Sequence, residues 1–239
     1  MTGRMIFIVC LSILLSSTLN LAHSEGMDLD VCVDATVVSK YIWRGFDVLD
    51  ANPAFQPSID LSFGDTGLGF NIWGSMALDD RSNLDDYDEV DFGLSFERDL
   101  TDYFSFSVGS VLYWYPNLDE DDTTYEVFFG GTLTQILFNP ALTLYYDLDL
   151  GDDLYAELSG SHDIPAGDYE LSTSLTIGYN NGQYEVDRGF SDMRLSASMD
   201  FPVWKLTITP GLNYTFILED TVNEDNGEFS VSLGVCVEF

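Results

Sequence analysis

Apolar and polar residues alternate with a period of two along most of the chain. From Phe229 to Phe239 every second residue is Phe, Val or Leu, and the residues between them are Ser, Gly, Cys or Glu. This period is typical of a β-strand whose two faces meet different surroundings. Twelve such segments lie at residues 28–44, 54–63, 68–78, 89–97, 103–115, 124–133, 141–150, 154–161, 169–179, 191–201, 204–216 and 228–239. Most have the length that a tilted strand needs to cross a bilayer.

The two faces of these segments differ in kind. One face is rich in Phe, Leu, Ile and Trp and carries no charged residue, whereas the other carries Ser, Thr, Gly and Asn together with acidic residues. In a soluble β-sandwich the apolar faces would share one core between two sheets. So many large apolar faces fit better in a barrel with lipid outside and water inside. The sequence therefore predicts an all-β fold, a closed antiparallel transmembrane β-barrel of about 12 strands.

The links between the segments alternate in length. Those after even-numbered segments are short, such as 64–67 and 202–203, whereas most of those after odd-numbered segments are long and acidic, such as 45–53 and 79–88. Short periplasmic turns and long outer loops are typical of bacterial outer-membrane barrels, and an even number of strands puts both termini in the periplasm. The terminal Phe239 resembles the signal that barrel-assembly machinery reads, so we expect that machinery as a partner during biogenesis.

The amino-terminal segment has the features of a secretory signal peptide. Arg4 precedes an apolar run over 5–15, and a small-x-small sequence ends at Ser24. An apolar run of this length is too short to span a bilayer as a helix. We therefore expect residues 1–24 to be cleaved, and residues 25–239 to form a single barrel domain in the outer membrane of a Gram-negative bacterium.

Charge narrows the range of partners. The 239 residues include 41 acidic and only 8 basic side chains, for a formal charge of −33. Binding of phosphate backbones needs clustered Lys and Arg, so nucleic acid is excluded as a partner. A disordered chain is excluded as well, because 46% of the residues are hydrophobic and 14% are aromatic.

The polar faces supply the candidate lumen-lining residues. Carboxylates two residues apart, such as Glu89 and Asp91, point the same way from a strand, and we expect them to form a hydrated wall that attracts cations. Bases are scarce, and Arg44, at the end of the first segment, is a candidate for a constriction with acids opposite. The lumen candidates are Asp34, Lys40, Arg44, Asp60, Glu89, Asp91, Glu126, Asp147, Asp149, Glu157, Glu170, Asp192 and Arg194.

Catalysis has little support in this inventory. Once the signal peptide is removed, His162 is the only histidine, so metal sites that need two histidines are excluded. A Ser-His-acid triad would have to use His162, which lies beside a turn, and we interpret it as a polar turn residue. The stretch from Asp147 to Glu157 resembles an EF-hand loop, but its Gly and Glu each come one position early and it falls in a hairpin. We expect no enzyme, no cofactor and no dedicated metal site. Asp119, Asp121 and Asp122 could hold divalent ions loosely at the surface, where such ions bridge lipopolysaccharide.

Two cysteines remain after signal cleavage. Cys32 lies in the first strand and Cys236 in the last, both on the polar face and near the same end. The first and last strands of a closed barrel pair with each other, and the periplasm permits disulfides. The two thiols could therefore form a bond that closes the barrel, or remain unpaired if the register is slipped.

Three strings near the start of the mature chain resemble a known family. They are Ser39-Lys40-Tyr41-Ile42-Trp43-Arg44-Gly45-Phe46, Asn52-Pro53-Ala54-Phe55-Gln56-Pro57-Ser58-Ile59-Asp60 and Gly69-Phe70-Asn71-Ile72-Trp73-Gly74-Ser75. They are similar to the opening of the TorF-type putative porins. The resemblance implies an outer-membrane barrel that passes small solutes, and it implies no catalytic residues.

The function predicted from the sequence is passive diffusion of ions or small hydrophilic molecules, with a preference for cations. Twelve strands lie between small barrels filled by side chains and porins with a wide aqueous channel. The alternative is a barrel that does not conduct and whose acidic loops bind ions or partners at the cell surface. Conductance of the purified protein distinguishes the two.

Overall fold

The computed structural model describes residues 29–120 and 122–239. The predicted signal peptide and Asp121 lie outside the described residues. Twelve long strands form the wall: β1 (Asp30–Val38), β4 (Ala54–Ser62), β5 (Leu68–Ala77), β6 (Glu89–Thr101), β7 (Phe104–Trp114), β8 (Thr123–Leu133), β9 (Ala141–Asp147), β10 (Leu154–Ala166), β11 (Tyr169–Asn180), β12 (Gly189–Met199), β14 (Leu206–Ile217) and β15 (Gly227–Glu238).

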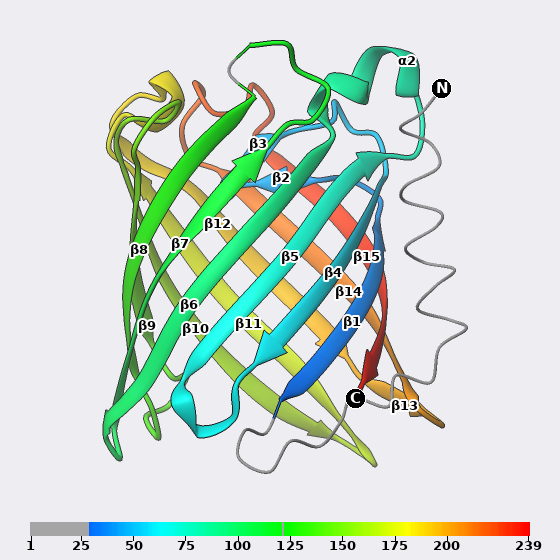
Figure 1. The fold of residues 1–239 in the computed structure, drawn as a ribbon, viewed down its shortest axis with the longest axis vertical. Helices are drawn as coiled ribbons and strands as arrows, with labels where there is room; N and C mark the ends of the chain where they lie inside the picture. Colours follow the sequence, from blue (N-terminus) through cyan, green and yellow to red (C-terminus); the bar gives the residue numbers. More distant parts are fainter. Residues whose placement is uncertain (1–28, 121) are drawn as a thin grey trace.

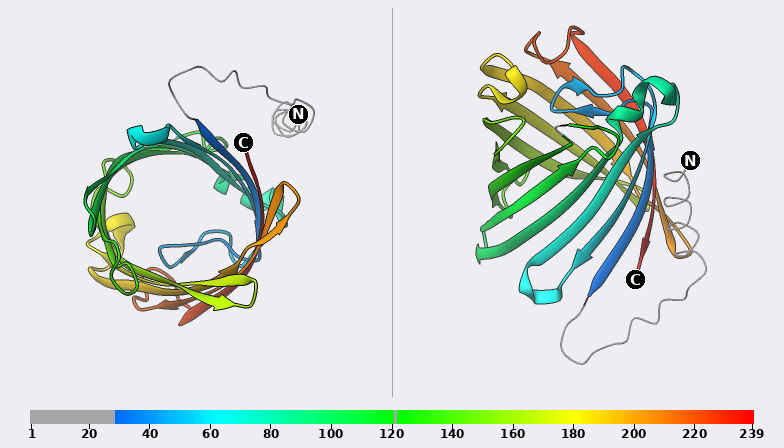
Figure 2. Two further views of the ribbon diagram at one scale, coloured as in Figure 1. Left: turned by 90° about the horizontal axis from the view of Figure 1, so that it is seen from below. Right: turned by 45° about the horizontal axis from the view of Figure 1, so that its top comes forward.

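These strands form a closed antiparallel ring. Neighbours in the chain pair with each other, β1 pairs with β15, and β12 pairs with β14 beside the short β13 (Phe201–Val203). Figure 2 shows the ring from one end, and the prediction of a closed barrel of about 12 strands is confirmed. Closure leaves no free strand edge, so the backbone donors and acceptors of the wall are satisfied without water.

The alternation in the sequence follows directly from this ring. On β8 the exposed fractions of Thr124 and Glu126 are 0% and 1%, whereas those of Tyr125 and Val127 are 51% and 42%. Every second side chain therefore points outward, and the outward ones are mainly Leu, Phe, Val and Tyr. Among the described residues, no helix is long and apolar enough to cross a membrane.

The two ends of the barrel differ. We call the end that carries the first residues of β1 and the last residues of β15 the turn end, where Val31 and Phe239 exchange backbone hydrogen bonds. We call the opposite end the loop end (Figure 1). Four short helical segments lie in the links of the described residues. At the loop end are α2 (Arg81–Leu84), η2 (Asp85–Tyr87) and η3 (Gln183–Glu185), and at the turn end is η1 (Gly64–Thr66).

The first strand is shorter than the sequence suggests, and the prediction of a strand over 28–44 is wrong after residue 38. β1 ends at Val38, and residues 39–53, which we call the inward loop, turn into the barrel (Figure 2). Ser39 ends the strand by exchanging hydrogen bonds with the backbone of Val231, through its N–H at 2.8 Å and its hydroxyl at 2.9 Å.

The inward loop contains a hairpin of its own. β2 (Ile42–Trp43) pairs with β3 (Phe46–Asp47), separately from the wall. The turn between them needs positive φ at both positions, +48° at Arg44 and +90° at Gly45. Glycine accepts this conformation without strain. It also leaves room, because a Cβ at Gly45 would lie 2.8 Å from Cγ1 of Val222.

Candidate functional site

The inward loop is packed against the wall by a small apolar core. Leu49 is fully buried and clusters with Ala54 on β4, Ala77 on β5 and Leu84 on α2. Hydrogen bonds within the loop add to this packing, because the N–H of Val48 donates to the carbonyl of Tyr41 at 3.0 Å. The loop is therefore a folded element inside the barrel.

Arg44 joins the hairpin to side chains on distant strands. Its Nη2 donates hydrogen bonds to both carboxylate oxygens of Glu126 on β8, at 2.6 and 3.0 Å, and its Nη1 donates to Oε1 of Gln183 at 2.7 Å. The side chain of Arg44 is only 8% exposed and that of Glu126 1%. Such a charge-assisted pair is directional and strong when it is shielded from water.

Three aromatic rings enclose the same guanidinium. Its central carbon lies 4.5 Å from the ring centre of Trp43, 4.7 Å from that of Tyr145 and 4.4 Å from that of Tyr155. Each contact is a cation–π interaction, and desolvated contacts of this kind are worth about 2 kcal/mol. We call these three rings the aromatic cage.

The order of strands shows that Arg44 crosses the lumen. Counting from β1 through β4, β5, β6 and β7, Glu126 lies five places around the ring on β8, and Tyr145 lies six places around on β9. In a ring of twelve strands, a strand six places away is diametrically opposite. Arg44 leaves the wall beside β1 and is bound at the opposite wall.

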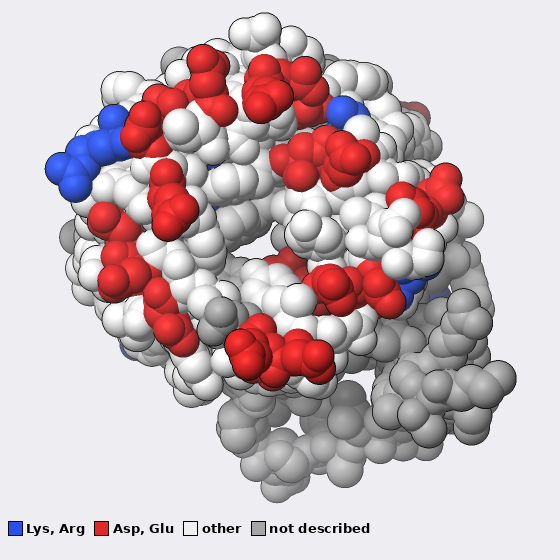
Figure 3. All heavy atoms as spheres, turned by 90° about the horizontal axis from the view of Figure 1, so that it is seen from above, with Lys and Arg blue, Asp and Glu red and all other residues white. Residues whose placement is uncertain are grey.

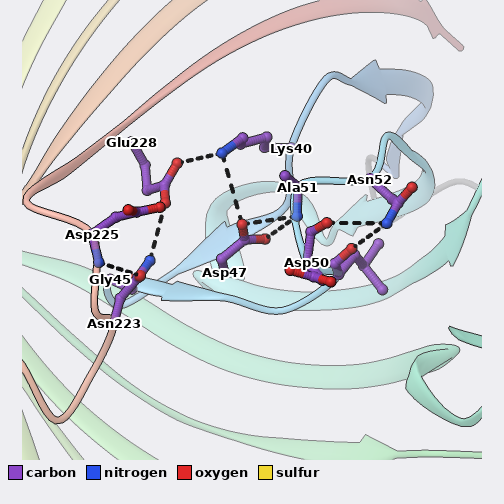
Figure 4. A network of polar contacts seen from close by, with 10 residues as sticks. Lys40, Gly45, Asp47, Asp50, Ala51, Asn52, Asn223, Asp225 and Glu228 are labelled. Carbon is purple, nitrogen blue, oxygen red and sulfur yellow. Dashed lines mark hydrogen bonds and ion pairs between the residues drawn. The ribbon is translucent and has the colours of Figure 1, made fainter.

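Lys40 holds the inward loop at a second point, on the near side. Its ammonium donates a 2.6 Å hydrogen bond to Glu228 on β15 and lies 3.8 Å from Asp47 (Figure 4). The hydrogen bond to Glu228 raises the pKa of Lys40 above its ordinary value. Asn223 connects the same Glu228 to the carbonyl of Gly45, at 3.2 and 3.4 Å.

Several interior carboxylates have no basic partner. Glu89 accepts hydrogen bonds from the hydroxyls of Tyr41 and Tyr115, and Asp192 accepts from those of Tyr155 and Ser191. Asp91 has a buried oxygen with no hydrogen-bond partner. Among the described residues, no Lys or Arg nitrogen lies within 4.0 Å of these three carboxylates. The interior is therefore acidic beyond what its bases neutralise.

The remaining lumen candidates are distributed along the barrel. Asp34, Glu157 and Arg194 are half-buried on β1, β10 and β12, and Asp60 is exposed on β4, where Asn71 donates to it at 2.7 Å. Glu170 is exposed at the turn end of β11. Three candidates lie outside the strands on which they were expected: Lys40 and Arg44 lie in the inward loop because β1 ends at Val38, and Asp149 is exposed in a loop because β9 ends at Asp147.

In the EF-hand-like stretch, the carboxylate of Asp147 is already hydrogen-bonded to the protein. Asp147 is fully buried and accepts from the hydroxyl of Thr124, the N–H groups of Asp149 and Gly151, and the hydroxyl of Tyr184. Within the described residues, no group of three or more His, Cys, Asp or Glu could hold a metal ion. Asp119 and Asp122 are exposed loop residues.

The loop end is acidic around its rim. Figure 3 shows red patches surrounding a central hollow. Each of the six loops at this end carries exposed acids, among them Asp50, Asp86, Asp119, Asp152, Glu185 and Glu224.

Some residues of the site were not found from the sequence. Gln183 and Tyr184 belong to the η3 loop, which shows no alternation, yet Gln183 is fully buried and Tyr184 stacks edge-on against Trp43 with ring centres 5.7 Å apart. An aromatic residue after Gly182 in an otherwise polar loop is the one signal that could have indicated them.

In its fold the protein is a porin-like β-barrel. Solved structures with this fold include the NanC porin, with 15% identity and a TM-score of 0.51 over 88% of this chain and 99% of that one. The KdgM porin in complex with disordered oligogalacturonate has 11% identity and a TM-score of 0.52 over 88% and 99%. LpxR from Salmonella typhimurium has 10% identity and a TM-score of 0.54 over 86% and 99%. These likenesses concern the fold.

The family is shown by the sequence itself. Residues 24–231 match the model of a family described as a bacterial protein of unknown function, Gcw_chp. This range covers most of the chain, and the chain belongs to that family. No curated protein matches it.

Proposed function

We propose that the protein is a channel of the bacterial outer membrane, through which ions and small hydrophilic solutes diffuse passively and cations pass more readily than anions. The observation that carries this proposal is the acidic interior, where Asp60 and Asp192 have no Lys or Arg nitrogen within 4.0 Å among the described residues. Fixed negative charge in a low-dielectric tube raises the local concentration of cations and repels anions. The acidic rim adds to the same field.

The outer surface supports a membrane location. Leu94, Phe129, Leu142, Leu212 and Phe229 are each at least half exposed, and in water a belt of this kind would favour aggregation. In a bilayer the same belt is in contact with lipid. The strings around Arg44, Gln56 and Trp73 support a narrower proposal, membership of the TorF-type putative porins.

The same proposal implies two partners of the barrel, lipopolysaccharide at the loop end and barrel-assembly machinery at the turn end. With the loop end facing outward, the exposed acids Asp119 and Asp122 would meet the anionic lipopolysaccharide of the outer leaflet through divalent ions. Phe239, 57% exposed at the turn end, would be available to barrel-assembly machinery. We propose no catalytic activity, since His162 is exposed at the turn end, where its ring contacts that of Phe138 with centres 5.6 Å apart.

One observation favours a second candidate, a barrel that does not conduct. The inward loop crosses the lumen and is bound to the opposite wall through Arg44 and Glu126. If the loop and the tyrosines around it fill the whole cross-section, the acidic loops at the rim become the functional surface, and the protein binds ions or partners there.

Ion release from vesicles distinguishes the two candidates. The refolded protein is inserted into liposomes loaded with potassium, and the release of potassium is followed over time against protein-free liposomes. We expect rapid release from the protein-containing vesicles. Release at the protein-free rate would overturn the channel and favour the closed barrel.

A further inference from the structure

We propose that the inward loop is the constriction of the channel, and that Arg44 is the residue that holds it across the lumen. This inference rests on the proposed function, because a constriction has meaning only where solutes pass. It concerns which element limits passage, and hydrogen exchange of the inward loop, measured beside conductance, separates its failure from failure of the channel.

The inward loop lies across the lumen. The inward loop begins beside β1, and its hairpin reaches side chains on β8, β9 and β10, which lie five, six and five places around the ring from β1. Gly45 at the tip is close to Asp192 on β12 and Ile217 on β14, since a Cβ there would lie 3.2 and 3.6 Å from their side chains. At this level, solutes must pass beside the hairpin.

The base and the tip of the inward loop are attached to the wall in different ways. The base of the loop is held by apolar packing of Leu49, whereas the tip is held by the ion pair of Arg44 with Glu126 and by the aromatic cage. Lys40 adds the pair with Glu228 on the near side. Loss of Arg44 would therefore free the tip while the base stays packed against β4 and β5.

Carboxylates remain beside the hairpin after Arg44 has been neutralised. Glu126 neutralises Arg44, so the one buried base of the hairpin contributes little net field. Tyr41 and Tyr115 contact Glu89 there, and the hydroxyl of Tyr155 contacts Asp192. The hairpin thus brings solutes close to carboxylates, and the narrow level becomes the place where cations are selected.

The test compares Arg44→Gln with a matched control, Arg81→Gln. Arg81 lies in α2 at the same end and pairs with Asp88, so its removal changes the charge equally, while Leu84 of the same helix keeps its packing against Leu49 and the ion pair of Arg44 is left in place. Two quantities are measured on refolded protein: hydrogen exchange of backbone amides over residues 41–52, and single-channel conductance in a planar bilayer.

We expect Arg44→Gln to speed exchange of the inward-loop amides by about 100-fold, because a buried ion pair no longer opposes local opening. Conductance should rise, and exchange of the wall strands should not change. Arg81→Gln should behave as wild type in both measurements. Unchanged exchange in Arg44→Gln, or faster exchange with unchanged conductance of a conducting wild type, would overturn the constriction and leave the channel proposal standing.

Two further outcomes concern the proposed function. If wild type does not conduct and Arg44→Gln does, the inward loop is a closed plug, which supports the inference and overturns an open resting channel. If neither conducts although exchange is faster, both proposals fail.

If Arg44→Gln does not fold, variants of the Lys40–Glu228 ion pair, the second attachment of the inward loop, provide the test. Lys40→Glu places two acids together at Glu228 and should free the near side of the loop, with faster exchange and higher conductance. The double variant Lys40→Glu with Glu228→Lys restores the pair and should return both quantities toward wild type. A double variant that behaves like Lys40→Glu alone would overturn the role of this attachment.

Discussion

The sulfur atom of Cys32 in the first strand lies 2.6 Å from that of Cys236 in the last. In the register of β1 and β15, Cys32 is opposite Glu238 and Cys236 is opposite Asp34, so the two cysteines are diagonal neighbours on the lumen face. They lie on the two strands whose pairing closes the barrel.

We propose that these cysteines form a disulfide in the mature protein, since the periplasm permits such bonds. Thiols are titrated in denatured protein with and without reductant. We expect free thiols only after reduction, and a Cys32→Ser variant should show one free thiol without reductant. Equal thiol titres with and without reductant in wild type would rule out the bond.

Charge on the outer surface should be far more costly than charge inside. Leu94 on β6 is 55% exposed on the outside, and the next residue, Ser95, is half-buried on the lumen side. Arginine facing lipid near the membrane centre costs about 2–4 kcal/mol. We expect Leu94→Arg to lower the free energy of unfolding by that amount in lipid vesicles, measured by urea titration.

Ser95→Arg is the matched variant of that experiment, one position along the same strand. Because its side chain points into the interior of the barrel and away from lipid, we expect little change in the free energy of unfolding. Equal destabilisation by the two variants would mean that the two faces are not lipid and water.

Asp147 should act as a structural residue of its loop. It is fully buried and accepts hydrogen bonds from Thr124, Asp149, Gly151 and Tyr184. Asp147→Ala leaves buried donors without an acceptor, and we expect a loss of about 1–3 kcal/mol in the free energy of unfolding. The exposed Asp149, replaced by Ala, should change it by less than about 0.5 kcal/mol.

The hydrogen bonds of Asp147 also lead us to expect that calcium does not stabilise the protein. Since both oxygens of Asp147 are already bonded to the protein, we expect the melting temperature to be the same with excess calcium and with a chelator. A rise in the melting temperature specific to calcium would show that the loop rearranges to bind the ion.

Most of the wall could be predicted because the outside and the inside of the barrel hold neighbouring residues of opposite polarity. β8 and β15 follow the two-residue period along their length, and their predicted bounds differ from the observed ones by no more than one residue at either end. The pattern carries this information because each side chain in the wall meets either lipid or the interior.

The inward loop could not be predicted from the same period. Tyr41 and Trp43 continue the apolar face of β1 in the sequence, yet they lie inside the barrel, where Tyr41 contacts Trp73 and Trp43 contacts Tyr113. A hairpin inside the lumen also has two unlike faces, so local alternation does not separate it from a membrane strand. The Arg44-Gly45 pair, a turn with positive φ, is the local signal that the strand has ended.

The interior carboxylates should carry the selectivity of the channel. Asp192 on β12 has no basic partner within 4.0 Å among the described residues, and it lies beside Gly45 at the tip of the inward loop. We expect Asp192→Asn to reduce the ratio of potassium to chloride permeability. Asp200→Asn, an exposed change at the turn end, should reduce it less. An equal or larger reduction from Asp200→Asn would place the selective level elsewhere.

The central claim is that the barrel conducts and prefers cations. The most direct measurement is the reversal potential of the refolded wild-type protein in a planar bilayer under a gradient of potassium chloride. Selective passage of potassium gives a reversal potential of the sign set by the potassium gradient, and this is the expected result. A reversal potential of the opposite sign, or one at zero, would contradict cation preference, and the absence of any current would contradict the channel itself.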